Sequence, residues 1–105
     1  MKITMYGAPI CGDCVTRKEQ LANIENLELD YHDITASTAN MREFLKYRDQ
    51  ESLFDDIKRE GRIGIPFFIL EDGTKTLEIE KYVQLQEVER KSLISACSLD
   101  GKGNC

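Results

Sequence analysis

The chain has 105 residues, of which 41% are hydrophobic and 31% charged, and its formal net charge is −5. This length and composition are typical of one small soluble domain with a single core, and they exclude a disordered chain and a protein of long apolar spans. No stripe of Lys and Arg is visible, which argues against nucleic acid as a partner. We expect a monomer that binds neither nucleic acid nor membranes.

The first residues indicate the compartment. MKITMYG has one Lys and alternates like a strand, whereas a signal peptide needs a basic start and an apolar stretch of about 7–15 residues. We therefore expect a cytoplasmic protein. Structural disulfides are rare in that reducing compartment, so the four cysteines indicate metal binding or transient redox chemistry.

A β-α-β unit is predicted at the start of the chain. Residues 2–6 alternate like a strand, and Gly7 ends the pattern. No helix breaker interrupts residues 12–23, where apolar side chains recur at helical spacing. Residues 27–34 then alternate apolar and polar with the two-residue period of a second strand.

The middle of the chain predicts a helix in two pieces. Ser37 or Thr38 caps the first piece, which runs to Tyr47. Ser52 caps the second, and Gly61 ends it. The residues expected to share the faces of these two helices are Met41, Phe44, Leu45, Arg48, Leu53, Phe54 and Ile57.

A hairpin and a last helix complete the predicted order β-α-β-α-β-β-α. Residues 67–70 are apolar at every position, as in a central strand that is covered on both faces. The Glu-Asp-Gly sequence at 71–73 predicts a tight turn into a strand over 76–79. A helix is predicted over 82–96, and the glycine-containing tail 97–105 is expected to be flexible.

The pair Cys11 and Cys14 has the spacing of a redox site. The positive end of a helix stabilises a thiolate in its first turn, and Cys11 lies where the predicted helix begins. Cys14, one turn later, can attack a mixed disulfide at Cys11 and release the product. Asp13 lies between them as a like charge, so we expect it to oppose the Cys11 thiolate.

Metal binding is the main alternative for this pair. A zinc site needs two further ligands, and the candidates His32, Cys97 and Cys105 are not closely paired in the sequence. His32 also fits a structural role on a strand. Cys97 and Cys105 are either incidental thiols or an accessory redox pair. No resident metal is expected.

The chain over residues 1–96 resembles the glutaredoxin and thioredoxin group of thiol oxidoreductases. The segment YGAPICGDC, the order of elements and the segment GIPFF carry the resemblance. It implies an α/β, thioredoxin-like (glutaredoxin) fold, with a four-stranded mixed sheet flanked by helices. The implied activity is reduction of protein disulfides or mixed disulfides, with Cys11 as nucleophile and Cys14 as resolving thiol.

The resemblance also implies substrate-binding residues. Pro66 corresponds to a cis-proline that faces the active-site sulfurs, and Ile65 would offer its backbone N–H and C=O to a bound peptide or glutathione. From the residues alone, the alternative is that Pro66 begins a strand in the trans form. Tyr6 would flank the substrate groove, with core packing as its alternative.

The sequence departs from the glutaredoxin pattern where glutathione would bind. Ala8 stands where glutaredoxins usually have a basic residue, and Glu78 and Glu80 would repel carboxylates. We expect Arg62 to compensate, with Lys58 and Arg59 as the other candidates.

No cofactor is expected to stay bound, and glutathione would be a co-substrate. The reductant would then be glutathione or a flavoprotein that resembles thioredoxin reductase. An iron–sulfur or metal-binding carrier related to glutaredoxin is the alternative function.

Overall fold

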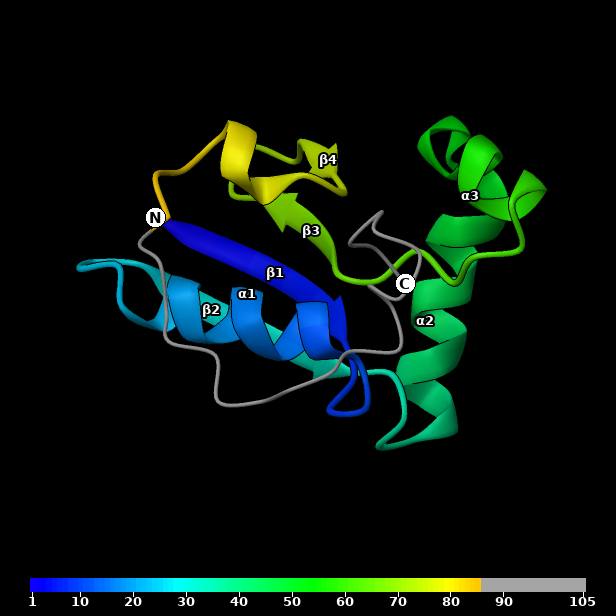
Figure 1. The fold of residues 1–105 in the computed structure, drawn as a ribbon, viewed down its shortest axis with the longest axis horizontal. Helices are drawn as coiled ribbons and strands as arrows, with labels where there is room; N and C mark the ends of the chain where they lie inside the picture. Colours follow the sequence, from blue (N-terminus) through cyan, green and yellow to red (C-terminus); the bar gives the residue numbers. More distant parts are fainter. Residues whose placement is uncertain (86–105) are drawn as a thin grey trace.

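The computed structural model describes residues 1–85, which form an α/β fold with a four-stranded mixed sheet and three α-helices (Figure 1). The predicted domain boundary at 96, the tail 97–105 and most of the predicted helix 82–96 lie outside these residues. The prediction that this helix begins at residue 82 is wrong, because residues 82–85 form a turn followed by irregular chain.

The sheet has the strand order β2-β1-β3-β4. β1, Lys2–Gly7, runs parallel to β2, Glu28–Asp33, and antiparallel to β3, Phe67–Leu70. The prediction that the apolar run of β3 is an inner strand is confirmed, since β4, Lys75–Thr76, pairs with its other edge. β2 and β4 are therefore the two edges of the sheet.

The two longest helices cover opposite faces of this sheet. α1, Gly12–Ala22, brings Cys14 against Gly7, whereas α2, Thr38–Gln50, brings Phe44 against Tyr6. Gly7 and Tyr6 are successive residues of β1, and successive residues of a strand point to opposite faces. We call these the α1 face and the α2 face; Figure 1 shows the two helices around β1.

The core on the α2 face is aromatic. Phe54 packs against Phe67 with ring centroids 5.0 Å apart, and Tyr47 packs against the same ring at 5.4 Å. Edge-on and tilted aromatic pairs of this kind add to the stability that burial gives. The rings of the cluster are those of Tyr6, Phe44, Tyr47, Phe54 and Phe67.

The start of α2 is predicted well and its buried face less well. Ser37 caps the helix, because its Oγ accepts the N–H of Asn40 at 3.1 Å. Met41 and Leu45, which the helical spacing placed in the core, are 41% and 39% exposed. Of the predicted inward residues of α2, Phe44 alone is fully buried, since the helix contacts the sheet along one narrow line.

The second helical piece consists of the 3-10 turn η1, Ser52–Phe54, and α3, Asp55–Arg59. Ser52 lies inside η1 and makes no capping bond, so its predicted role as a cap is wrong. The predicted stop at Gly61 is confirmed. Its φ of 71° lets the N–H of Arg62 reach the carbonyl of Ile57 at 2.9 Å, a common way to end a helix.

The β3–β4 hairpin turns at Gly73, with a φ of 91°, as the sequence predicts. β4 is shorter than the predicted strand over 76–79. Thr76 Oγ1 accepts the N–H of Glu78 at 2.9 Å, which turns the chain away from the sheet and into the 3-10 turn η2, Ile79–Lys81.

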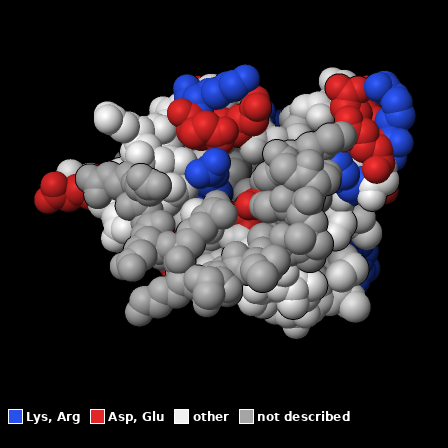
Figure 2. All heavy atoms as spheres, in the orientation of Figure 1, with Lys and Arg blue, Asp and Glu red and all other residues white. Residues whose placement is uncertain are grey.

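On the face drawn in Figure 2, acidic and basic side chains lie next to one another in groups near the upper edge. On α3, Asp55 pairs with Lys58 and Asp56 with Arg59, at 3.8 Å and 2.7 Å. Exposed pairs of this kind contribute little to stability. No helix within residues 1–85 is long and apolar enough to cross a membrane.

Candidate active site

The two cysteines lie where the loop after β1 enters α1. Cys11 is the N-cap of the helix, and its Sγ accepts the N–H of Cys14 at 3.3 Å. The N–H of Cys11 is bound in turn by the carbonyl of Ala8 at 3.1 Å, which closes the loop. Both cysteines are free thiols in this structure. The predicted position of Cys11 at the start of the helix is therefore confirmed.

The surroundings of the two sulfurs push their acidities in opposite directions. The hydrogen bond from the Cys14 thiol, together with the Cys14 N–H, lowers the pKa of Cys11 against the opposing effect of burial. The same thiol hydrogen bond, burial and the Cys11 charge raise the pKa of Cys14. The two shifts therefore favour the thiolate form of Cys11 and the thiol form of Cys14.

Asp13 lies in the first turn of α1, between the cysteines, and is buried with 7% of its surface exposed. Its carboxylate charge raises the pKa of Cys11, while its backbone N–H lowers it. The charge acts in the direction that the sequence predicts, against the thiolate. The hydrogen bonds from Cys14 outweigh this charge, because the pKa of Cys11 still lies below its ordinary value.

The cysteine loop buries its sulfurs and exposes an apolar neighbour. Cys11 and Cys14 are 2% and 0% exposed, so both residues are buried. Ile10, directly before Cys11, is 81% exposed. The loop therefore presents a large hydrophobic side chain to solvent next to the reactive sulfur.

Gly7 is a site residue whose role the sequence did not reveal. A Cβ at this position would lie 3.0 Å from Cys14 Sγ and 3.4 Å from Cε1 of Tyr31. A side chain here would displace the sulfur, so the glycine lets Cys14 pack directly on β1. The only signal in the sequence was a glycine at the end of the strand, which does not tell what packs against it.

Pro66 lies directly before β3, near the end of β1. Tyr6 pairs with Phe67 in the antiparallel register of β1 and β3, and continuing that register by one residue brings Pro66 opposite Gly7. The Ile65–Pro66 peptide bond is cis, the form that the resemblance implies.

Arg48 fastens the segment before Pro66 to α2. Its Nε donates to the carbonyl of Ile63 at 2.8 Å, and its Nη2 donates to the carbonyl of Arg62 at 2.6 Å. Gly64 follows with a φ of 96°, and a Cβ there would lie 2.7 Å from Cε1 of Phe54. Helical spacing predicted the inward position of Arg48 but not this task.

Tyr6 does not line a surface groove, so its predicted role in substrate binding is corrected in favour of core packing. Its ring is 2% exposed and lies 5.9 Å from that of Phe67. Its hydroxyl donates to Glu43. Burial and this carboxylate raise the pKa of Tyr6, which therefore stays protonated.

Arg62 and Ile65 are placed differently from each other. Ile65, directly before Pro66, is buried with 2% of its surface exposed. Arg62 lines a cavity of about 400 Å³ between α3 and β4, together with Lys75 and Glu78, and its guanidinium pairs with Glu60 at 3.0 Å. No residue of the cysteine loop lines that cavity.

Within residues 1–85, no three His, Cys, Asp or Glu side chains are grouped so that they could hold a metal ion. His32 Nε2 lies 3.1 Å from Asp30, and its Nδ1 lies 4.0 Å from Glu43. Cys97 and Cys105 lie outside the described residues, so their two interpretations remain predictions.

An uncharacterized protein of Haemophilus influenzae is 32% identical to this chain over 63 residues, which cover 58% of the chain and 73% of that protein. The chain belongs to the same family as this Haemophilus protein. That relative is itself uncharacterized, so the match assigns no activity to this chain. No protein-family model matches the chain. No solved structure matches it.

Proposed function

We propose that the chain is a thiol–disulfide oxidoreductase with a thioredoxin-like, glutaredoxin-type fold. The observation that carries the proposal is the opposed acidity of two adjacent sulfurs, with Cys11 favoured as thiolate at the N-cap of α1 and Cys14 as thiol. A lowered thiol pKa is what a nucleophilic cysteine requires at neutral pH. The β1-α1-β2 unit and the antiparallel β3–β4 hairpin with Pro66 are compatible with that fold.

The reaction consists of two exchanges. The Cys11 thiolate attacks one sulfur of a substrate disulfide, forms a mixed disulfide and releases the other sulfur as a thiolate. Cys14 then loses its proton, attacks Cys11 Sγ and releases the second substrate thiol, which leaves a Cys11–Cys14 disulfide. The substrate gains two electrons and the cysteine pair loses them.

Two features control the second exchange. The hydrogen bond between the thiol of Cys14 and Cys11 places the two sulfurs in contact before any substrate arrives. The pKa of Cys14 is raised partly by the Cys11 charge, and that charge disappears once Cys11 is in a mixed disulfide. Cys14 therefore loses its proton more easily once the mixed disulfide has formed.

The cycle closes when a reductant returns two electrons to the disulfide. Glutathione or a flavoprotein that resembles thioredoxin reductase would fill this role, and the reducing cytoplasm is the compartment in which we expect the cycle to run. Ala8 is buried and cannot offer glutathione the charge of a basic side chain. This favours a protein disulfide over a glutathione mixed disulfide as substrate.

The test is a disulfide-reductase assay on Cys11→Ser and Cys14→Ser. We expect Cys11→Ser to abolish turnover and Cys14→Ser to trap a mixed disulfide that mass spectrometry detects. Equal residual activity in the two variants would contradict the assigned roles. The assay is then run with glutathione or with a flavoprotein reductase as the electron source. The one that supports turnover is the reductant.

A further inference from the structure

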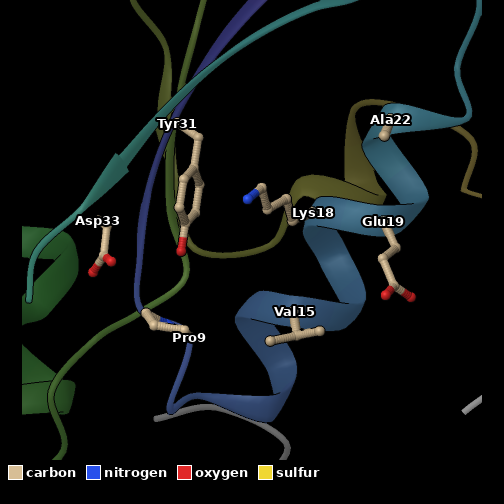
Figure 3. A pocket seen from close by; sticks show the side chains of 7 residues that line it. All are labelled: Pro9, Val15, Lys18, Glu19, Ala22, Tyr31 and Asp33. Atoms are coloured by element: carbon tan, nitrogen blue, oxygen red, sulfur yellow. The ribbon is translucent and has the colours of Figure 1, made fainter. Parts of the chain in front are cut away.

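The structure has a cavity beside the cysteine loop that the two proposed exchange steps do not use. It has a volume of about 370 Å³ and lies between α1 and β2. Pro9 of the cysteine loop, Val15 and Lys18 of α1, and Tyr31 of β2 line it (Figure 3). A volume of this size is at the lower end of the range found for ligand sites in proteins.

The ring of Tyr31 joins this cavity to the active site. Lys18 and Tyr31 face each other across it, with Nζ 4.2 Å from the ring centroid, and the Tyr31 hydroxyl points toward Pro9 (Figure 3). The ring edge packs on Gly7, the same residue against which Cys14 Sγ packs. The charges of both cysteines contribute to raising the pKa of Tyr31, after burial as the main cause. Any occupant of the cavity therefore lies close to the reacting sulfurs.

We propose, building on the function above, that this cavity receives an aromatic side chain of a polypeptide substrate, next to the cysteine of its disulfide. Tyr31 and Pro9 supply flat apolar surface, and the Lys18 ammonium supplies a cation for the face of a second ring. An aliphatic side chain would gain from burial alone. Ile10, which lies between Pro9 and Cys11 in the chain, adds an exposed apolar side chain to the loop that a substrate chain can contact.

The charges around the cavity define the rest of the substrate. Asp33 lies on one side of the cavity and Glu19 on the other, against the single ammonium of Lys18 (Figure 3). The whole chain has a net charge of −5, which also repels anions. The substrate segment is therefore neutral or basic around its aromatic residue.

Three disulfide-linked peptides that differ in the residue next to the cysteine test the proposal. With a phenylalanine there, we expect kcat/KM to be about tenfold higher than with an alanine. A glutamate at the same place should give the lowest value of the three. Equal kcat/KM for the phenylalanine and alanine peptides would overturn the proposal and leave the proposed function intact. If none of the three peptides is reduced, the proposed function itself fails.

Variants of the cavity show whether the preference arises there. Val15→Trp fills the cavity, and Lys18→Met removes its cation, so both should reduce the phenylalanine-to-alanine ratio, Val15→Trp to about one. Lys46→Met, at an exposed position of α2, is the matched control and should keep the wild-type ratio. Lys18→Met keeps the test decisive if Val15→Trp does not fold. If Lys18→Met and Val15→Trp both keep the wild-type phenylalanine-to-alanine ratio of kcat/KM, the preference for an aromatic residue does not arise in this cavity and the proposal is overturned.

Discussion

On the α2 face of the sheet, Tyr6 joins a sealed aromatic cluster and its hydroxyl is fixed by Glu43. On the α1 face, Tyr31 leaves a cavity open beside it and packs near two thiols. The two tyrosines come from neighbouring strands of one sheet, and their surroundings differ in packing density and in charge. The comparison teaches that the α1 face, although it buries Leu21 completely, keeps a cavity beside its tyrosine, whereas rings surround the tyrosine of the α2 face.

The largest effect that separates the faces should come from Gly64→Ala. A Cβ there would lie 2.7 Å from the Phe54 ring of the α2-face cluster, on a backbone with a φ of 96°. Overpacking and backbone strain together should lower the free energy of unfolding by about 3 kcal/mol. Urea unfolding measures this, and the pKa of Cys11 in the folded variant should stay unchanged.

The matched control for this variant is Gly61→Ala. Gly61 also has a positive φ, of 71°, but nothing lies within 4 Å of a Cβ there. The substitution should cost only about 1 kcal/mol. Equal losses in the two variants would mean that contact with the aromatic cluster contributes nothing.

On the α1 face, Gly7→Ala should cost less stability than Gly64→Ala, but it should change the pKa of Cys11. Its Cβ would lie 3.0 Å from Cys14 Sγ, so the sulfur must shift and the hydrogen bond to Cys11 weakens. We expect a loss of about 1–2 kcal/mol in unfolding free energy, together with a higher pKa of Cys11 and slower disulfide exchange. A thiol titration by ultraviolet absorbance measures the shift. An unchanged titration would show that Gly7 does not position the sulfur.

The sequence predicted this division only in part. Alternation in residues 2–6 identified one strand through its two-residue period, and the apolar run 67–70 identified another because an inner strand is covered on both faces. Alternation does not say which helix covers which face, so it could not decide between a groove and the core for Tyr6. The tasks of Gly7 and Gly64 depend on contacts between distant segments, and a sequence pattern does not contain such contacts.

Helical spacing had a similar limit at α2. It grouped Met41 and Leu45 with Phe44 correctly as one stripe, but the depth of burial depends on how the helix crosses the sheet. The cysteine pair was more predictable, because a strand, a tight loop and a helix start are all local features. Cys11 therefore lies where the sequence predicted, while the cavity at Tyr31 required the fold.

A smaller effect within the α1 face should come from Asp13→Asn. The Asp13 charge raises the pKa of Cys11, so its removal should lower that pKa and move the onset of activity to lower pH. Asp56→Asn, also in the first turn of a helix, is the matched control and should leave the pKa unchanged. A titration of the thiolate in both variants checks this. Identical Cys11 titration curves in Asp13→Asn and wild type would contradict the electrostatic role.

The smallest effect should appear only in alkali, at the tyrosine of the α1 face. Burial, with the charges of Cys14, Asp33 and Cys11, raises the pKa of Tyr31 from 10.0 to about 12. The unfolded chain thus loses this proton first, so the stability from Tyr31 is complete below pH 10 and is lost as the pH rises to about 12. In Tyr31→Phe this part of the alkaline loss should disappear. Urea unfolding at several alkaline pH values measures it against Tyr82→Phe, a variant at a half-exposed tyrosine. If both variants lose stability with the same slope as wild type, the protonated Tyr31 hydroxyl contributes nothing to the α1 face.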